Sequence, residues 1–159
     1  MENSGGPDGD VDNLWGMTFH PVPDELKLRP LTDQILIRDI LDLCVDERTR
    51  DRGGLCLLLC DAQYRLVEPV RYDEVPDDCT EEDIDRILGR FVPLLREIVP
   101  DVTLMLAVAR PGAPVPDDLD LAWRAVAERV CAQTGIELLD VWLVTPGGSC
   151  PVEAEAAVT

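Results

Sequence analysis

Residues 104–148 read LMLAVARPGAPVPDDLDLAWRAVAERVCAQTGIELLDVWLVTPGG, and this stretch is the most informative part of the sequence for the fold. It opens on an unbroken apolar run of strand length that ends at Arg110. Apolar residues at helical spacing follow over 117–134, and Gly135 is well placed as the left-handed residue that ends the helix. A second apolar run covers 137–144. The stretch therefore predicts a strand, a proline-rich loop, a helix and another strand, which is the layout of an α/β domain.

Two further helices are predicted upstream of this stretch. Helical spacing of apolar residues begins after Thr32, a plausible N-cap, and we expect that helix to end near Arg48. A second helix begins after Thr80, because a hydroxyl cap followed by carboxylates suits the positive end of a helix. Pro93 should kink this helix or divide it into two shorter ones.

Two further extended runs complete the predicted sheet. Residues 55–60 and 64–72 should form a hairpin whose first strand is buried on both faces, and the buried strand that opens the stretch quoted above should cover 102–109. Helices and strands in this order predict an α/β (α+β) domain with a single mixed sheet and flanking helices. The predicted organisation is a disordered acidic tail (1–13), an extended proline-rich arm (14–31), one α/β domain (32–153) and a frayed C-terminus (154–159).

The charge composition limits the classes of partner that the protein can bind. The 159 residues include 14 basic and 32 acidic side chains, a net charge of −18, and this field repels phosphate backbones and anionic lipids. We therefore expect neither nucleic acid nor a membrane as a partner. Acidity of this kind keeps a protein soluble, and it also suits a basic protein partner or mimicry of the charge of DNA.

Six cysteines are scattered among apolar residues, and none forms a Cys-x-x-Cys pair. Zinc sites need closely spaced ligands in two groups, so these thiols are interpreted as reduced core residues of a cytoplasmic protein. The first residues lack the pattern of a secretory signal. Lys27 is the one lysine beside many arginines, and this bias is typical of GC-rich bacterial genomes. The cysteines are Cys44, Cys56, Cys60, Cys79, Cys131 and Cys150.

The chain resembles the JAB/MPN domain in its bacterial RadC-like form. Three pieces in the same order carry the likeness: LCLLLCDAQYRLVEPV at 55–70, the capped helix that leads to the strand at 102, and the stretch 104–148 with GIELLD at 135–140. This resemblance implies a cytidine-deaminase-like architecture. It also implies the place of a zinc site, held in that family by two histidines and an aspartate, beside a glutamate that takes a proton from the metal-bound water.

The residues at those family positions differ from the family pattern. The two histidine positions correspond to Val108 and Arg110, the aspartate to Asp120, and the glutamate falls near Val70, with Glu68 on the same strand face. Valine offers no lone pair and a guanidinium repels Zn²⁺. We therefore expect no metal, no cofactor and no hydrolase activity, and we predict that Arg110 pairs with Asp120 instead. His20, the single histidine of the sequence, lies in the arm and does not restore the site.

The resulting hypothesis is a bacterial pseudoenzyme that acts as a protein-interaction or scaffolding module. Trp15, Phe19 and Trp123 would anchor a partner if they are exposed, because aromatic residues concentrate interface energy. Trp123 could equally belong to the core, and Trp142 is predicted there. Two alternatives stay open: a hydrolase of another kind that uses acidic residues or a hard divalent ion, and an acidic decoy of a nucleic-acid-binding protein.

Overall fold

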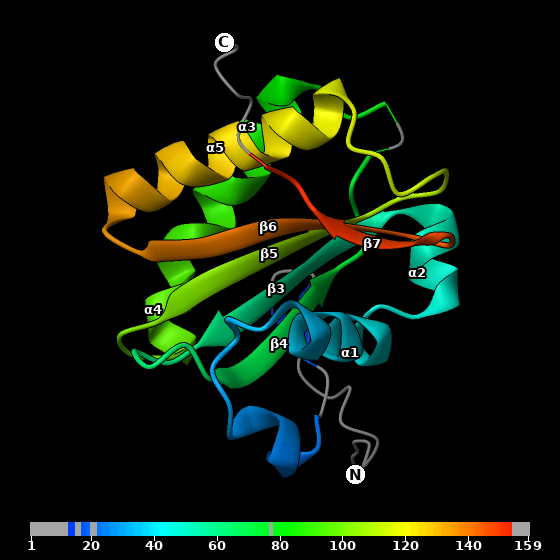
Figure 1. Cartoon of the computed structure of the whole chain (residues 1–159). Coiled ribbons are helices and arrows are strands. Elements are labelled where there is room, and N and C mark those ends of the chain that lie inside the picture. Colours follow the sequence, from blue (N-terminus) through cyan, green and yellow to red (C-terminus); the bar gives the residue numbers. More distant parts are fainter. Residues whose placement is uncertain (1–12, 15–16, 20–21, 77, 154–159) are drawn as a thin grey trace, which may run out of the picture.

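The computed structural model describes residues 13–14, 17–19, 22–76 and 78–153 (Figure 1). The predicted tail up to residue 12, the frayed C-terminus at 154–159 and His20 lie outside the described residues. None of the helices in the described ranges has the length and hydropathy needed to span a bilayer.

The described strands form one seven-stranded mixed sheet in the order β1-β2-β4-β3-β5-β6-β7. Strands β5 and β6 pair in parallel and every other neighbouring pair is antiparallel, so the predicted single mixed sheet is confirmed. The strands are β1 (Asn13–Leu14), β2 (Met17–Phe19), β3 (Gly54–Cys60), β4 (Leu66–Tyr72), β5 (Thr103–Ala109), β6 (Glu137–Thr145) and β7 (Gly148–Pro151).

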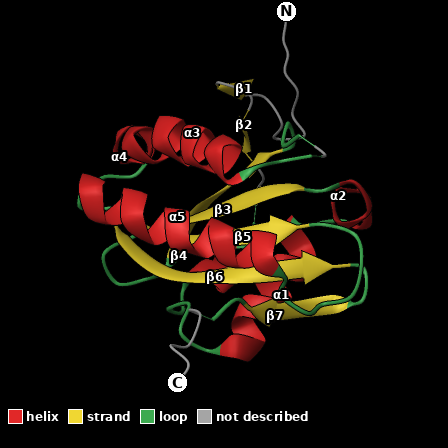
Figure 2. Ribbon diagram, turned by 90° about the horizontal axis from the view of Figure 1, so that it is seen from above, coloured by secondary structure: helices red, strands yellow, loops and turns green. Residues whose placement is uncertain are grey.

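Helices cover both faces of this sheet (Figure 2). Helices α3 and α5 lie together on one face, α1 lies on the other, and α2 stands at the end of the sheet where β5 finishes (Figures 1 and 2). The described helices are α1 (Gln34–Cys44), α2 (Glu47–Arg52), α3 (Glu81–Phe91), α4 (Leu95–Ile98) and α5 (Asp118–Thr134), with 3₁₀ turns at Asp24–Lys27 and Val92–Leu94.

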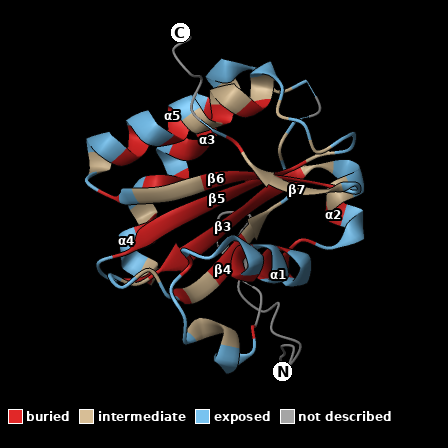
Figure 3. Cartoon of the chain, in the orientation of Figure 1, coloured by how far each residue is buried: buried red, intermediate tan, exposed pale blue. Residues whose placement is uncertain are grey.

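The central strands, which Figure 3 shows buried, separate two apolar cores. All seven residues of β3 and all seven of β5 are buried, as predicted for strands covered on both faces. Alternate residues of β3 enter different cores: Leu57 packs with the residues of α3 and α5, whereas Leu58 packs with those of α1. Trp142 on β6 is fully buried in the second core, which confirms its predicted place.

The first predicted helix is wrong at both ends. Its N-cap is Asp33 and not Thr32, because the Asp33 carboxylate accepts a hydrogen bond of 3.0 Å from the N–H of Ile35. The helix ends at Cys44 and does not reach Arg48, which belongs to the separate helix α2. Asp46 starts that second helix by accepting a bond of 2.9 Å from a backbone N–H.

The hairpin and the second helix follow the prediction more closely. Strand β4 begins at Leu66 and not at Tyr64, since the Asp61 carboxylate accepts backbone bonds at 2.8 and 3.0 Å and holds residues 61–65 in a turn. Thr80 caps α3 in a reciprocal capping box, and Pro93 lies in the 3₁₀ turn that divides α3 from α4. Both predictions for this helix are confirmed.

Described parts of the predicted arm pack on the domain itself. Strand β2 pairs with β4, with Met17 opposite Tyr72, and so extends the sheet at that edge. Val22 and Leu31 are buried in the core beneath α1. Residues before 32 therefore contribute to the same folded unit as the predicted domain.

Candidate functional site

The candidate site lies where β5 leaves the sheet. The Arg110 N–H donates to the carbonyl of Val144 at 3.1 Å, which extends the pairing with β6 by one residue beyond the end of β5. The chain then turns through Gly112, whose φ of +106° lies in the region that favours glycine, and reaches α5 at Asp117. The Arg110 side chain is therefore held at the rim of the sheet beside the first turn of a helix.

Arg110 and Asp120 form a direct ion pair, as predicted. The Arg110 Nη2 atom lies 2.8 Å from Asp120 Oδ2, and Nε lies 3.2 Å from each carboxylate oxygen. The Asp120 side chain is 1% exposed and that of Arg110 is 22% exposed. A carboxylate buried this far is stable as an anion only with such a partner. The hydrogen bond to Asp120 raises the pKa of Arg110, so the guanidinium stays charged.

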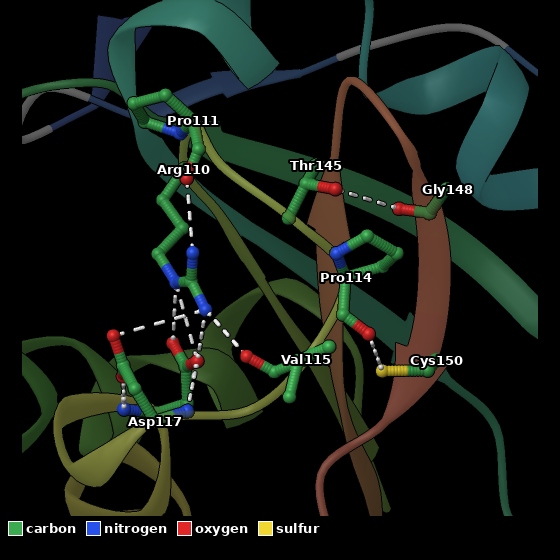
Figure 4. A network of polar contacts seen from close by, with 9 residues as sticks. Arg110, Pro111, Pro114, Val115, Asp117, Thr145, Gly148 and Cys150 are labelled. Atoms are coloured by element: carbon green, nitrogen blue, oxygen red, sulfur yellow. Dashed lines mark hydrogen bonds and ion pairs between the residues drawn. The ribbon is translucent and has the colours of Figure 1, made fainter.

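The same guanidinium closes the proline-rich loop (Figure 4). Its Nη1 donates to the carbonyl of Pro111 and its Nη2 to the carbonyl of Val115, both at 2.9 Å. Cys150 on β7 holds the other side of the loop, because its thiol donates to the Pro114 carbonyl at 3.2 Å. Arg110 thus serves as the centre of a network that fixes the loop between β5 and α5.

Asp120 also forms part of the N-terminal capping box of α5. Its Oδ2 accepts from the N–H of Asp117 at 2.9 Å, and Asp117 Oδ1 accepts in return from the N–H of Asp120 at 2.9 Å. Burial acts to raise the pKa of Asp117, but the hydrogen bonds with Asp120 and the charge of Arg110 outweigh it, so this pKa lies below its ordinary value. The helix start and the ion pair form one unit.

The donor set at this position does not fit zinc. Val108 is buried and has no donor atom, Arg110 carries a positive charge, and both oxygens of Asp120 are engaged by N–H groups. Within the described residues, no three His, Cys, Asp or Glu side chains lie close enough together to hold a metal ion.

Glu68, the fourth residue predicted for this site, lies elsewhere, and that prediction is wrong. It pairs with Leu59, which in turn pairs with Leu104, whereas Val108 pairs with Leu55. Residues 104 and 108 of one strand are about 13 Å apart, at roughly 3.3 Å per residue. The register of the hairpin puts the glutamate toward the other end of the sheet from the Arg110–Asp120 pair.

A cleft of about 480 Å³ opens beside the ion pair. Trp123 and Val108, 2% and 5% exposed, form its floor, while the half-buried Val75 and Leu119 form its walls. Arg110 and Asp120 lie along one side. The cleft therefore has an apolar surface beside the ion pair of Arg110 and Asp120, and such a surface suits the side chain of a ligand or partner.

Of the three predicted surface anchors, Trp123 is the one whose side chain the structure describes. Trp15 lies outside the described residues, and for Phe19 the structure describes the backbone in β2 and not the side chain. Trp123 is 2% exposed, so it belongs to the core and to the cleft floor and is not a protruding anchor; its helical position packs it against the sheet. Sequence reasoning missed Val75 and Leu119, which carry no chemical signal of their own.

The thiols are mostly enclosed. Cys44, Cys56, Cys60 and Cys131 are buried, and Cys79 and Cys150 are half-buried, so the prediction of core thiols holds for four of the six. Burial raises the pKa of Cys60 to about 12 and that of Cys131 to about 11.

Neither the known protein-family models nor the curated protein sequences give a match to this chain.

Proposed function

We propose that this chain is a non-catalytic protein-interaction module on a metal-free, JAB/MPN-like arrangement of strands and helices, and that the cleft beside Arg110 receives a side chain of its partner. The order of hairpin, capped helix, strand, proline-rich loop, helix and strand supports the likeness.

The main support for this proposal is that both oxygens of the Asp120 carboxylate already accept hydrogen bonds. Among the described residues, the hydrogen bonds of this carboxylate come from N–H groups of Arg110 and Asp117, so the position that the resemblance assigns to a metal ligand is used for structure. The pair and the capping box fix the loop that borders the cleft. A rigid rim of this kind lowers the entropy lost when a partner binds.

The cleft suits recognition because its surface is largely apolar but still accessible. Half-buried Leu119 and Val75 can each contact an inserted side chain, and the backbone around them is set by the start of α5 and by the segment before α3. The net charge of −18 favours a partner whose remaining surface is basic.

Two measurements test this function. Metal analysis of protein expressed in zinc-supplemented medium should find no stoichiometric zinc, and a one-to-one content would overturn the metal-free assignment. Affinity capture from the native host, read by mass spectrometry, should recover a partner with the wild-type chain and lose it with Leu119→Arg, because a charge in the apolar wall obstructs docking.

Ile35→Arg is the matched control. Ile35 is 69% exposed on α1, on the opposite face of the sheet, so the same added charge there should leave capture unchanged. A partner that resists Leu119→Arg but is lost when residues 1–16 are removed would place the interface in the N-terminal segment and refute the role of the cleft. That truncation leaves β2 in the sheet.

A further inference from the structure

A second hollow, of about 370 Å³, adjoins the cleft. It lies between α2 and the end of β4, and it shares Arg52 and Gly53 with the cleft as common lining residues. Three arginines line it, Arg48 and Arg52 from α2 and Arg71 from β4. Such a concentration of guanidinium groups stands out on a chain whose net charge is −18.

The backbone brings these arginines together. Gly53, with φ of +103°, ends α2 and donates its N–H to the Thr49 carbonyl at 2.7 Å. A Cβ on Gly54 would lie 3.2 Å from Asp73 Oδ1 and 3.3 Å from Thr49 Cγ2, so the absence of a side chain there lets α2 approach the end of β4. Residues 48 and 52 are one helical turn apart and share a face of α2.

The carboxylates in the hollow already have partners. Asp46 caps α2 through a 2.9 Å bond from the Thr49 N–H, and this bond holds its pKa below the ordinary value. Asp73 lies 3.1 Å from Nε of Arg71. Arg48 and Arg52, by contrast, make no ion pair or hydrogen bond through their side chains to any residue in the described part of the chain. Three guanidinium groups against two carboxylates leave the hollow with a positive charge.

We infer that this hollow binds a compact oxyanion, the phosphate or carboxylate group of a small molecule. A guanidinium presents its N–H groups in a planar fork that matches both phosphate and carboxylate oxygens, and two such forks with no partner among the described residues line this hollow with a third. The negative charge of the rest of the chain is screened beyond about 8 Å at physiological ionic strength, so it disfavours long polyanions more than a small anion at the arginines themselves. The inference is independent of the proposed protein partner.

Titration of the full ¹⁵N-labelled chain with inorganic phosphate, and separately with acetate, tests the site at constant ionic strength and pH. Saturable shifts of the backbone amides of residues 48–54 and 71–73 are expected. Tighter binding of phosphate would assign a phosphate group and tighter binding of acetate a carboxylate, and either supports an oxyanion site. Shifts that never saturate with both anions would overturn the inference.

Arg52→Gln should weaken binding about fivefold, the loss expected for one partly exposed charged contact, and Arg48→Gln combined with it should abolish saturation. Both residues are exposed, so the fold should persist, and unchanged signals from the two cores check this. Arg65→Gln removes the same charge from the exposed β3–β4 turn, at the other end of the sheet. Equal weakening by Arg65→Gln would mean that net charge alone attracts the anion and would refute a site.

Discussion

Replacing Arg110 with methionine tests the central structural claim of the site. The change removes three N–H contacts to Asp120, at 2.8, 3.2 and 3.2 Å, and leaves that carboxylate with the Asp117 N–H as its remaining contact. Because Asp120 is 1% exposed, water cannot replace the lost donors without opening the loop.

The expected cost follows from that burial. Removing one partner of a buried ion pair destabilises by about 3–5 kcal/mol, and the partial exposure of Arg110 places this case near the lower value. For a chain of this size, about 3 kcal/mol lowers the Tm by roughly 6–12 °C. Urea unfolding followed by circular dichroism, together with a thermal scan, measures both quantities.

A second substitution separates charge burial from packing. Asp120→Asn keeps an oxygen that can accept from the Asp117 N–H but removes the negative charge, so the double variant with Arg110→Met should recover about 2 kcal/mol relative to Arg110→Met alone. If Arg110→Met costs under about 1 kcal/mol, or if Asp120→Asn restores nothing, the carboxylate does not depend on the guanidinium and the reasoning fails.

Three further predictions concern the scaffold around the site. Arg50→Gln should destabilise by about 2 kcal/mol in urea unfolding, because the 12% exposed Arg50 side chain donates to the carbonyls that end α1 and to β6, whereas Arg65→Gln should stay within about 0.5 kcal/mol. Gly53→Ala should cost about 1 kcal/mol or more at its positive φ, while Gly89→Ala, with open space around the added methyl in α3, should raise the Tm. Asp46→Ala should cost about 1 kcal/mol at pH 7 through loss of the α2 cap. Since the folded pKa of Asp46 lies below its unfolded value, that contribution is present above about pH 4 and disappears as the pH falls through the folded pKa, so the two proteins should converge in an acid titration of stability.

Local signals in the sequence predicted much of the fold. The caps at Thr80 and Gly135 and the division at Pro93 depend on short-range geometry, and the structure has all three. The predicted end of the first helix was wrong because no glycine or proline between Cys44 and Gly53 marks a stop in the sequence. The helix breaks at Val45, whose backbone is extended and whose side chain is buried. The spacing of apolar residues does not encode this tertiary packing.

Some features of the candidate site could likewise be predicted from the sequence and others could not. The Arg110–Asp120 pair was predicted from the resemblance, which implied that a residue at a strand end and one at the next helix start belong to the same site. The position of Glu68 could not, since it depends on the register and the bulge between β3 and β4. Arg48 and Arg52 have helical spacing that was visible in the sequence, but nothing local showed that Arg71 would face them.

From the sequence alone the central strands and the capped starts of α3 and α5 could be predicted, because these depend on neighbours within a turn or two of chain. Which charges of the described residues pair with one another depends on the tertiary structure. Asp120 is buried and pairs with Arg110, and Asp73 pairs with Arg71. Arg48 and Arg52 line the hollow beside α2. The physical reason is that the energy of a charge depends on burial and on the distance to its partner, and both are set when the strands pair and the helices pack.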